Sequence, residues 1–77
     1  MAKRTTYDVQ PAKQRGGWDV VKEGGAAVSH HQTKPPAIES AVRHAKHEPL
    51  GEVRIKGRDG KIQDERTYGK DPYPPKG

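Results

Sequence analysis

The chain has 77 residues, with 15 Lys and Arg against 10 Asp and Glu, a formal net charge of +5 and no cysteine. Disulfides, thiolate nucleophiles and sulfur-built zinc sites are therefore excluded, and we expect no deep active-site cavity in so short a chain. Because no apolar run approaches the roughly 18 residues of a membrane span and no apolar secretory stretch follows the first residues, we expect a cytoplasmic protein without membrane contacts.

Two alternating segments near the start of the chain predict a β-hairpin. Apolar and polar side chains alternate in residues 5–10 and again in residues 18–21, and the glycine-rich segment 13–17 between them indicates a turn. Residues 27–31 predict a third, shorter strand. The inner face of the hairpin is expected to hold four large side chains: Tyr7, Val9, Trp18 and Val20.

A single apolar stripe then predicts a helix. Its members recur at positions i, i+3, i+4 and i+7: Ile38, Ala41, Val42 and Ala45. Thr33 is the candidate N-cap, but Pro35 and Pro36 push the residues before them out of the helical region, so the first full helical residue is expected as late as Pro36. Glu48-Pro49 ends the helix. The last turn carries side chains whose positive charge suits the negative end of the helix dipole: Arg43, His44, Lys46 and His47.

A second hairpin completes the order of elements. A strand of alternating apolar and charged residues precedes the turn 57–60, and residues 61–67 return as the last strand. The Asp-Gly pair in this turn is the strongest hairpin signal in the chain. Ile62 is expected on the inner face, opposite Ile55 if the loop has four residues or opposite Gly57 if it has two.

These elements predict a two-layer α+β domain. One amphipathic helix laid across one antiparallel sheet of four to five strands buries every apolar stripe together. The domain is expected to span residues 5–68, between a flexible N-terminus of residues 1–4 and an extended proline-rich tail of residues 69–77. Few large apolar residues are available, so we expect a folded domain of marginal stability.

Several motifs resemble a known family. They are the glycine-led strand at residues 17–20, the alanine-spaced helix and, above all, residues 57–63 running into residues 67–72. Together they are similar to the small bacterial domain-of-unknown-function family numbered two-one-eight-eight, over residues 7–75. The resemblance implies a compact α+β domain, and it implies no activity and no catalytic residue. The chain departs from the family pattern at residues 34–36, where the two prolines replace ordinary helix formers.

The surplus of basic residues supplies the first functional hypothesis. Six cations belong to the second hairpin or to the end of the helix: Arg43, Lys46, Arg54, Lys56, Arg58 and Lys61. If these cations lie on one side of the molecule, they could follow a phosphate backbone. This pattern predicts a nucleic-acid-associated accessory protein. Acidic residues of the same hairpin weaken that field, and a solvated face of mixed charge is the competing interpretation. Trp18 is expected in the core, which leaves Tyr68 and Tyr73 for base stacking.

Metal binding and catalysis are not indicated. His44 and His47 lie one helical turn apart, but the adjacent His30 and His31 point to opposite faces of a strand, so three or four ligands do not converge. Neither serine lies in a nucleophile motif. We therefore expect no metal, no cofactor, no catalytic residue and no enzymatic activity.

A protein-interaction module or a small homodimer is the alternative function. Binding of a second copy or of another protein would bury further apolar surface and so stabilise a domain with a small core. The contact could form at a sheet edge. The tail offers a second surface with the spacing of polyproline ligands: Pro72, Tyr73, Pro74 and Pro75.

Overall fold

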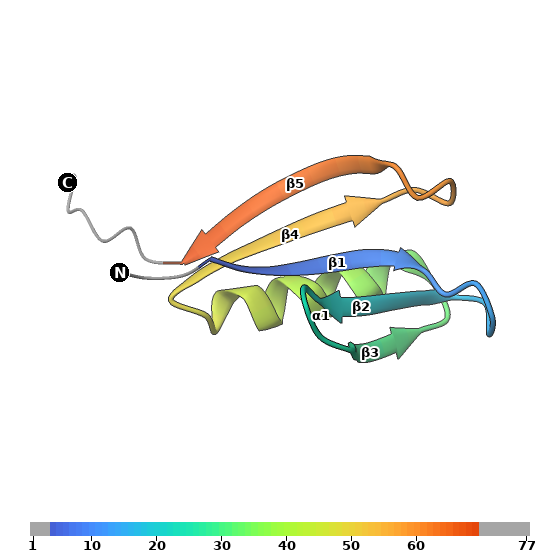
Figure 1. Cartoon of the computed structure of the whole chain (residues 1–77), viewed down its shortest axis with the longest axis horizontal. Coiled ribbons are helices and arrows are strands. Elements are labelled where there is room, and N and C mark those ends of the chain that lie inside the picture. Colours follow the sequence, from blue (N-terminus) through green and yellow to red (C-terminus); the bar gives the residue numbers. More distant parts are fainter. Residues whose placement is uncertain (1–3, 70–77) are drawn as a thin grey trace.

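The computed structural model describes residues 4–69, which form one helix and a five-stranded sheet (Figure 1). The elements in chain order are β1 (Thr5–Pro11), β2 (Trp18–Lys22), β3 (Ala27–His31), α1 (Lys34–Lys46), β4 (Leu50–Lys56) and β5 (Ile62–Gly69). In space the strands follow the order β3-β2-β1-β4-β5. Both outer strands of the sheet therefore have one free edge within the described part of the chain.

The sheet is mixed, which corrects the prediction of a purely antiparallel one. Three neighbouring pairs are antiparallel, but the central pair, β1 and β4, is parallel. Two successive hairpins give β3 the direction of β1, and α1 then carries the chain back to the end where β1 begins. Strands on either side of such a helical crossover run in the same direction, so β4 must be parallel to β1.

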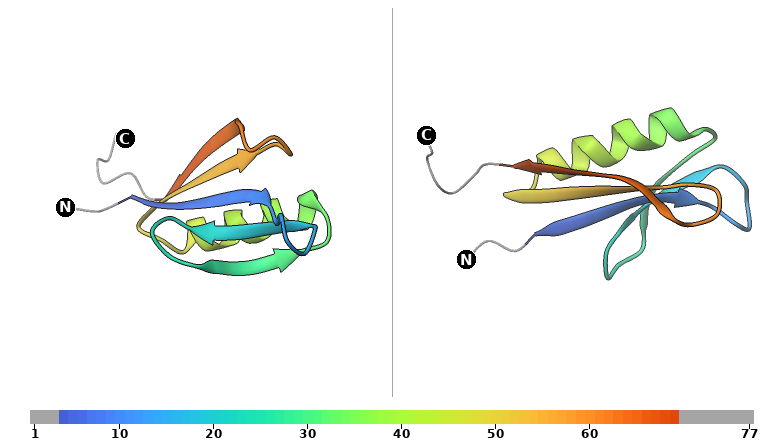
Figure 2. Two further views of the ribbon diagram at one scale, coloured as in Figure 1. Left: turned by 45° about the vertical axis from the view of Figure 1, so that its right-hand side comes forward. Right: turned by 90° about the horizontal axis from the view of Figure 1, so that it is seen from above.

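The core lies between α1 and one face of the sheet (Figure 2). All four side chains expected on the inner face of the first hairpin are buried, which confirms that prediction: Tyr7, Val9, Trp18 and Val20. Val53 and Ile55 of β4 complete the strand side of the core. The alternation of the two central strands thus directs one apolar face toward the helix.

The helix packs on the sheet through its smallest side chains. Ala37, Ala41 and Ala45 are fully buried, whereas Ile38 and Val42 of the expected stripe are half-buried and pack on the flank of the core. The buried stripe is therefore rotated from the predicted one toward the alanines.

A glycine of β4 completes the close contact of helix and sheet. A Cβ at Gly51 would overlap the backbone of Ala45, so position 51 leaves no room for a side chain. The C-terminal end of α1 therefore lies close against the start of β4.

The pairing of β4 with β5 differs from both predicted registers. Lys56 is opposite Ile62, and a bulge then shifts the register so that Ile55 is opposite Asp64. The extra residue turns Ile62 to the outer face, where it is 46% exposed, so its predicted inner position is wrong. The connection is closed by hydrogen bonds from Gly57 N to Lys61 O (2.8 Å) and from Gly60 N to Gly57 O (2.9 Å).

The ends of α1 follow from local chemistry. The helix begins at Lys34, two residues before the expected start, and its first turn accepts Pro35 and Pro36 because N–H groups there have no intrahelical partner. Thr33 has the extended backbone of an N-cap but its side chain makes no capping hydrogen bond. The expected basic last turn is present, with Arg43, His44 and Lys46. The tail predicted at residues 69–77 lies, from residue 70 on, outside the described residues, as do residues 1–3.

Candidate functional site

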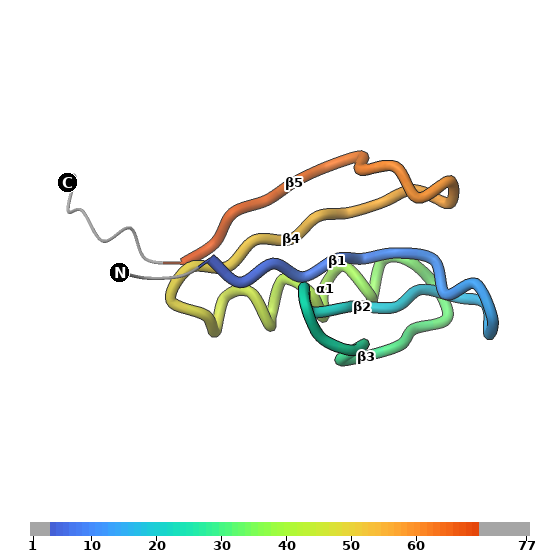
Figure 3. The backbone as a smooth tube through the Cα atoms, in the orientation of Figure 1, coloured from blue at the N-terminus to red at the C-terminus, as the bar shows by residue number. Residues whose placement is uncertain are grey.

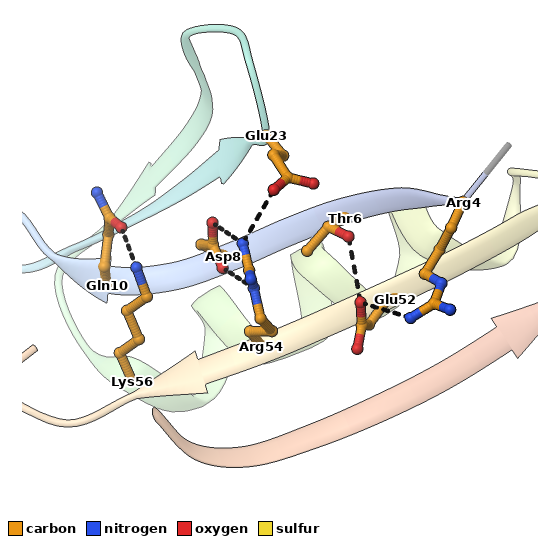
Figure 4. Close-up of polar contacts among 8 residues, drawn as sticks. All are labelled: Arg4, Thr6, Asp8, Gln10, Glu23, Glu52, Arg54 and Lys56. Carbon is orange, nitrogen blue, oxygen red and sulfur yellow. Dashed lines mark hydrogen bonds and ion pairs between the residues drawn. The ribbon is translucent and has the colours of Figure 1, made fainter. Parts of the chain in front are cut away.

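The face of the sheet opposite α1 carries rows of paired polar side chains (Figure 4). In the parallel register, Thr6 is opposite Glu52 and Asp8 is opposite Arg54. The Thr6 hydroxyl donates to Glu52 Oε1 at 3.2 Å, and Arg4 donates to the same oxygen at 3.3 Å. Charge on this face is therefore largely compensated by partners on neighbouring strands.

Arg54 is the most firmly held cation of this face. Its Nε donates to Asp8 Oδ1 at 2.8 Å and its Nη2 to Asp8 Oδ2 at 3.2 Å, and Glu23 accepts a longer contact at 3.5 Å. Hydrogen bonding to Asp8 raises the pKa of the Arg54 guanidinium above its ordinary value. Such a two-point ion pair orders and neutralises the guanidinium, so Arg54 presents little free charge.

Lys56, two residues after Arg54 on β4, lies at the rim of an open hollow of about 260 Å³. The hollow is lined by Gln10, Pro11, Lys13, Lys56, Arg58, Asp59 and Gly60. Lys56 Nζ donates to Gln10 Oε1 at 3.2 Å, a neutral partner that leaves its charge uncompensated. Three cations thus meet one carboxylate here, and that carboxylate, Asp59, already accepts a hydrogen bond from the Lys61 backbone N–H at 3.0 Å.

Two cations lie over the Trp18 ring. Lys34 Nζ is 4.9 Å and Arg58 Cζ is 5.8 Å from the ring centroid, within the range of cation–π attraction. Lys34 also donates to Gln63 Oε1 at 2.8 Å. Trp18 itself is only 5% exposed, so the indole packs beneath these cations and is not accessible for base stacking.

We define the basic tip as six side chains from three connections and their flanks: Lys13, Arg15, Lys34, Lys56, Arg58 and Lys61. The β1–β2 loop, the start of α1 and the β4–β5 turn all lie at the same end of the molecule (Figures 1 and 3). Two carboxylates accompany these six cations, Asp19 and Asp59, and Asp19 accepts hydrogen bonds from Arg15 and His30. The remaining residues of 4–69 contain six cations against seven carboxylates. The positive surplus of the described chain therefore lies at the basic tip.

The six cations predicted from the sequence are not gathered on one surface. Lys56, Arg58 and Lys61 belong to the basic tip, whereas Arg54 lies on the outer face beside Asp8. Arg43 and Lys46 belong to the C-terminal half of α1, where they line a different hollow together with Arg66 and Tyr68.

Three cations of the tip were missed from the sequence. Lys13 and Arg15 belong to a segment interpreted only as a turn, and Lys34 precedes the prolines of the helix start. The missing signal was the parallel pairing of β1 and β4, which brings the loops that follow these two strands to one end.

Three of the histidines each have a different hydrogen-bond partner. His30 Nδ1 is 2.7 Å from Asp19 Oδ1, His31 Nε2 is 3.0 Å from Ser29 Oγ, and His44 Nδ1 is 2.9 Å from the Ser40 carbonyl oxygen. Across residues 4–69, no group of three or more His, Cys, Asp or Glu side chains is placed to hold a metal ion. The two serines hydrogen-bond each other at 2.9 Å.

The other surfaces named from the sequence are a sheet edge and the proline-rich segment. Strands β3 and β5 are the two edges of the sheet. Pro72, Tyr73, Pro74 and Pro75 lie outside the described residues. The helix in the described part of the chain is too short and too polar to cross a membrane.

Comparison with known proteins identifies a family and nothing further. The family model described as an uncharacterised protein conserved in bacteria (DUF2188) matches residues 7–68, which confirms the resemblance seen in the sequence. No curated protein and no solved structure matches the chain.

Proposed function

Taking as premise that the chain belongs to the uncharacterised bacterial family DUF2188, we propose that it binds the phosphate backbone of duplex nucleic acids through the basic tip. The observation that carries this proposal is the unequal distribution of charge. Six cations and two carboxylates occupy the tip, while cations and carboxylates nearly balance over the remainder of residues 4–69. A concentrated positive end attracts a polyanion and orients it toward that end.

The chemistry of the tip favours the backbone over the bases. The Trp18 indole is buried under Lys34 and Arg58 and offers no surface for stacking. Lysine and arginine side chains on loops neutralise phosphates whatever the base sequence. The proposed activity is therefore sequence-independent and prefers duplexes to single strands.

The remainder of the surface supports an end-on mode of contact. On the outer face, Arg54 is neutralised by Asp8, and Arg4 and Thr6 share Glu52. A duplex laid along this face would meet carboxylates as often as free cations. At the tip, Lys56 and Arg58 share a hollow with one carboxylate.

The test compares two triple variants that each remove three positive charges. The tip variant carries Lys13→Gln, Lys56→Gln and Arg58→Gln. The matched control carries Lys22→Gln, Arg43→Gln and Lys46→Gln, away from the tip. Binding of labelled duplex DNA and duplex RNA is measured by fluorescence anisotropy at several salt concentrations, with circular dichroism to confirm that both variants are folded.

We expect the tip variant to lose about tenfold or more in affinity and the control about twofold or less. With about four phosphate contacts, the wild-type log K falls against log salt with a slope of about −3.6, and the tip variant is expected to reduce that slope by about 2–3. The proposal is refuted if wild-type protein binds neither duplex at low salt, or if both variants lose affinity equally.

A further inference from the structure

A second surface, independent of the basic tip, lies between α1 and β5. It is a groove of about 490 Å³ lined by Ile38, Glu39, Val42, Arg43, Lys46, Arg66 and Tyr68. Three of these side chains are apolar, half-buried and packed against the core: Ile38, Val42 and Tyr68. The volume lies within the range of sites that accept small ligands or a few side chains of a partner.

The groove exists because one helix cannot cover five strands. A helix with its side chains is about 10 Å wide, and neighbouring strands are about 4.8 Å apart, so α1 covers little more than two strands. It packs most closely on β1 and β4 and lies to one side of β5 (Figure 1). The face of β5 that adjoins the helix therefore stays open, with Arg66 opposite Val53 and Tyr68 opposite Gly51.

The distribution of side chains on α1 leaves its largest aliphatic residues beside this opening. The fully buried stripe consists of alanines, and Ile38 and Val42 lie on the flank toward β5. A chain with few large apolar residues loses hydrophobic stabilisation by leaving these two half-exposed, and a bound partner would recover it.

The rim of the groove is cationic. Arg43, Lys46 and Arg66 face one carboxylate, Glu39, in the lining. Arg66 donates to Asp64 at 3.1 Å, but Arg43 and Lys46 have no ion pair with any carboxylate of residues 4–69. Lys46 Nζ lies 5.7 Å from the Tyr68 ring centroid, so its charge stays at the edge of the apolar floor.

We propose that this groove binds a short acidic peptide segment of a partner protein, with aliphatic side chains on Ile38, Val42 and Tyr68 and carboxylates at Arg43 and Lys46. Charge complementarity selects this occupant. A second copy docked groove to groove would bring together six cations and two carboxylates of the lining, which is repulsive. A nucleic-acid backbone would satisfy the cations but would leave the apolar floor without a partner.

The test selects ligands from a phage-displayed library of random peptides on the immobilised full chain. We expect enriched peptides to combine Asp or Glu with Leu, Ile or Val. The dissociation constant of the best synthetic peptide is then measured with Arg43→Gln/Lys46→Gln and with Val42→Ser. Matched controls are Lys13→Gln/Arg58→Gln for charge and Val28→Ser, an exposed valine on β3, for apolar surface.

We expect each groove variant to weaken binding about tenfold and each control to change it about twofold or less. The proposal is overturned if no peptide is enriched, if enriched peptides lack acidic residues, or if the controls weaken binding as much as the groove variants. Loss with Arg43→Gln/Lys46→Gln but not with Val42→Ser also overturns it, because binding would then be charge attraction without a groove. Nucleic-acid binding by the tip is unaffected by any of these outcomes.

Discussion

Two small residues set the distance between the helix and the sheet. Ala45 is fully buried on α1, and Gly51 of β4 lies against its backbone so closely that any Cβ there would overlap it. The backbone of Ala45 cannot move away without carrying the end of α1 off the core. This contact makes glycine necessary at position 51 for reasons of space alone.

We therefore predict that Gly51→Ala lowers the free energy of unfolding by about 1–3 kcal/mol. The matched control is Gly25→Ala in the β2–β3 turn, where the nearest atom to a new Cβ is 3.6 Å away, an ordinary contact. The control should change stability by about 0.5 kcal/mol or less. Urea unfolding of the two variants measures the difference, and equal stabilities would show that helix and sheet are not packed this closely.

Tyr7 joins the core to the end of the helix. Its ring is buried beside His44, and its hydroxyl donates to Glu48 Oε2 at 2.7 Å. Burial, together with the hydrogen bond to Glu48 and the charge of that carboxylate, raises the pKa of Tyr7 from 10.0 to about 12. The folded state thus holds this proton more tightly than the unfolded state does.

This difference predicts a loss of stability at alkaline pH. The stabilising contribution is fully present below pH 10 and is lost as pH rises toward about 12, by about 2–3 kcal/mol over the interval. In Tyr7→Phe the loss over the same interval should be smaller by that amount. Unfolding at several pH values and the ultraviolet absorbance of phenolate measure both effects, and a Tyr7 midpoint near 10 would contradict the prediction.

At the scale of elements, one extra residue in β5 changes which of its side chains lie on the helix side of the sheet. The bulge between Ile55 and Lys56 turns Ile62 outward and gives the helix side of β5 the polar residues Asp64 and Arg66. Ile62 thus contributes to the outer surface of the hairpin, whereas Ile55, 4% exposed, belongs to the core.

We predict that Ile55→Ala lowers the free energy of unfolding by about 2–5 kcal/mol, while Ile62→Ala changes it by about 0.5 kcal/mol or less. The two substitutions remove the same atoms from adjacent strands, so they test the register and little else. Thermal or urea unfolding of the pair gives the answer. Comparable losses would place Ile62 in the core and restore one of the registers expected from the sequence.

The elements themselves were accessible to sequence reasoning, and their pairing was less so. The inner face of the first hairpin followed from the alternation around Trp18 and Val20, because period-two patterns specify a face directly. A bulge leaves no such pattern, since the turn at Asp59-Gly60 is compatible with several registers. Parallel pairing of β1 with β4 is a long-range choice that depends on the crossover through α1, and neither strand carries a local signal for it.

At the scale of the whole molecule, the fold separates charges that the sequence intermingles. Lys56, Arg58 and Lys61 were named from the sequence because they are near neighbours along the chain. Lys13 and Lys34 join them only because three connections meet at one end. Conversely, Arg54 lies only two residues before Lys56 in the sequence, but its charge is compensated by Asp8. Proximity in the chain therefore predicted about half of the candidate site, and topology supplied the rest.

The measurement that tests the central proposal most directly is a titration of the isotope-labelled full chain with duplex DNA, followed residue by residue through its amide chemical shifts. We predict that the perturbed amides cluster at the basic tip, in residues 12–17, 33–35 and 56–61, and that they recover as salt is added. Perturbations that centre instead on Arg43, Lys46 and β5, or a spectrum unchanged by saturating duplex at low salt, would contradict it.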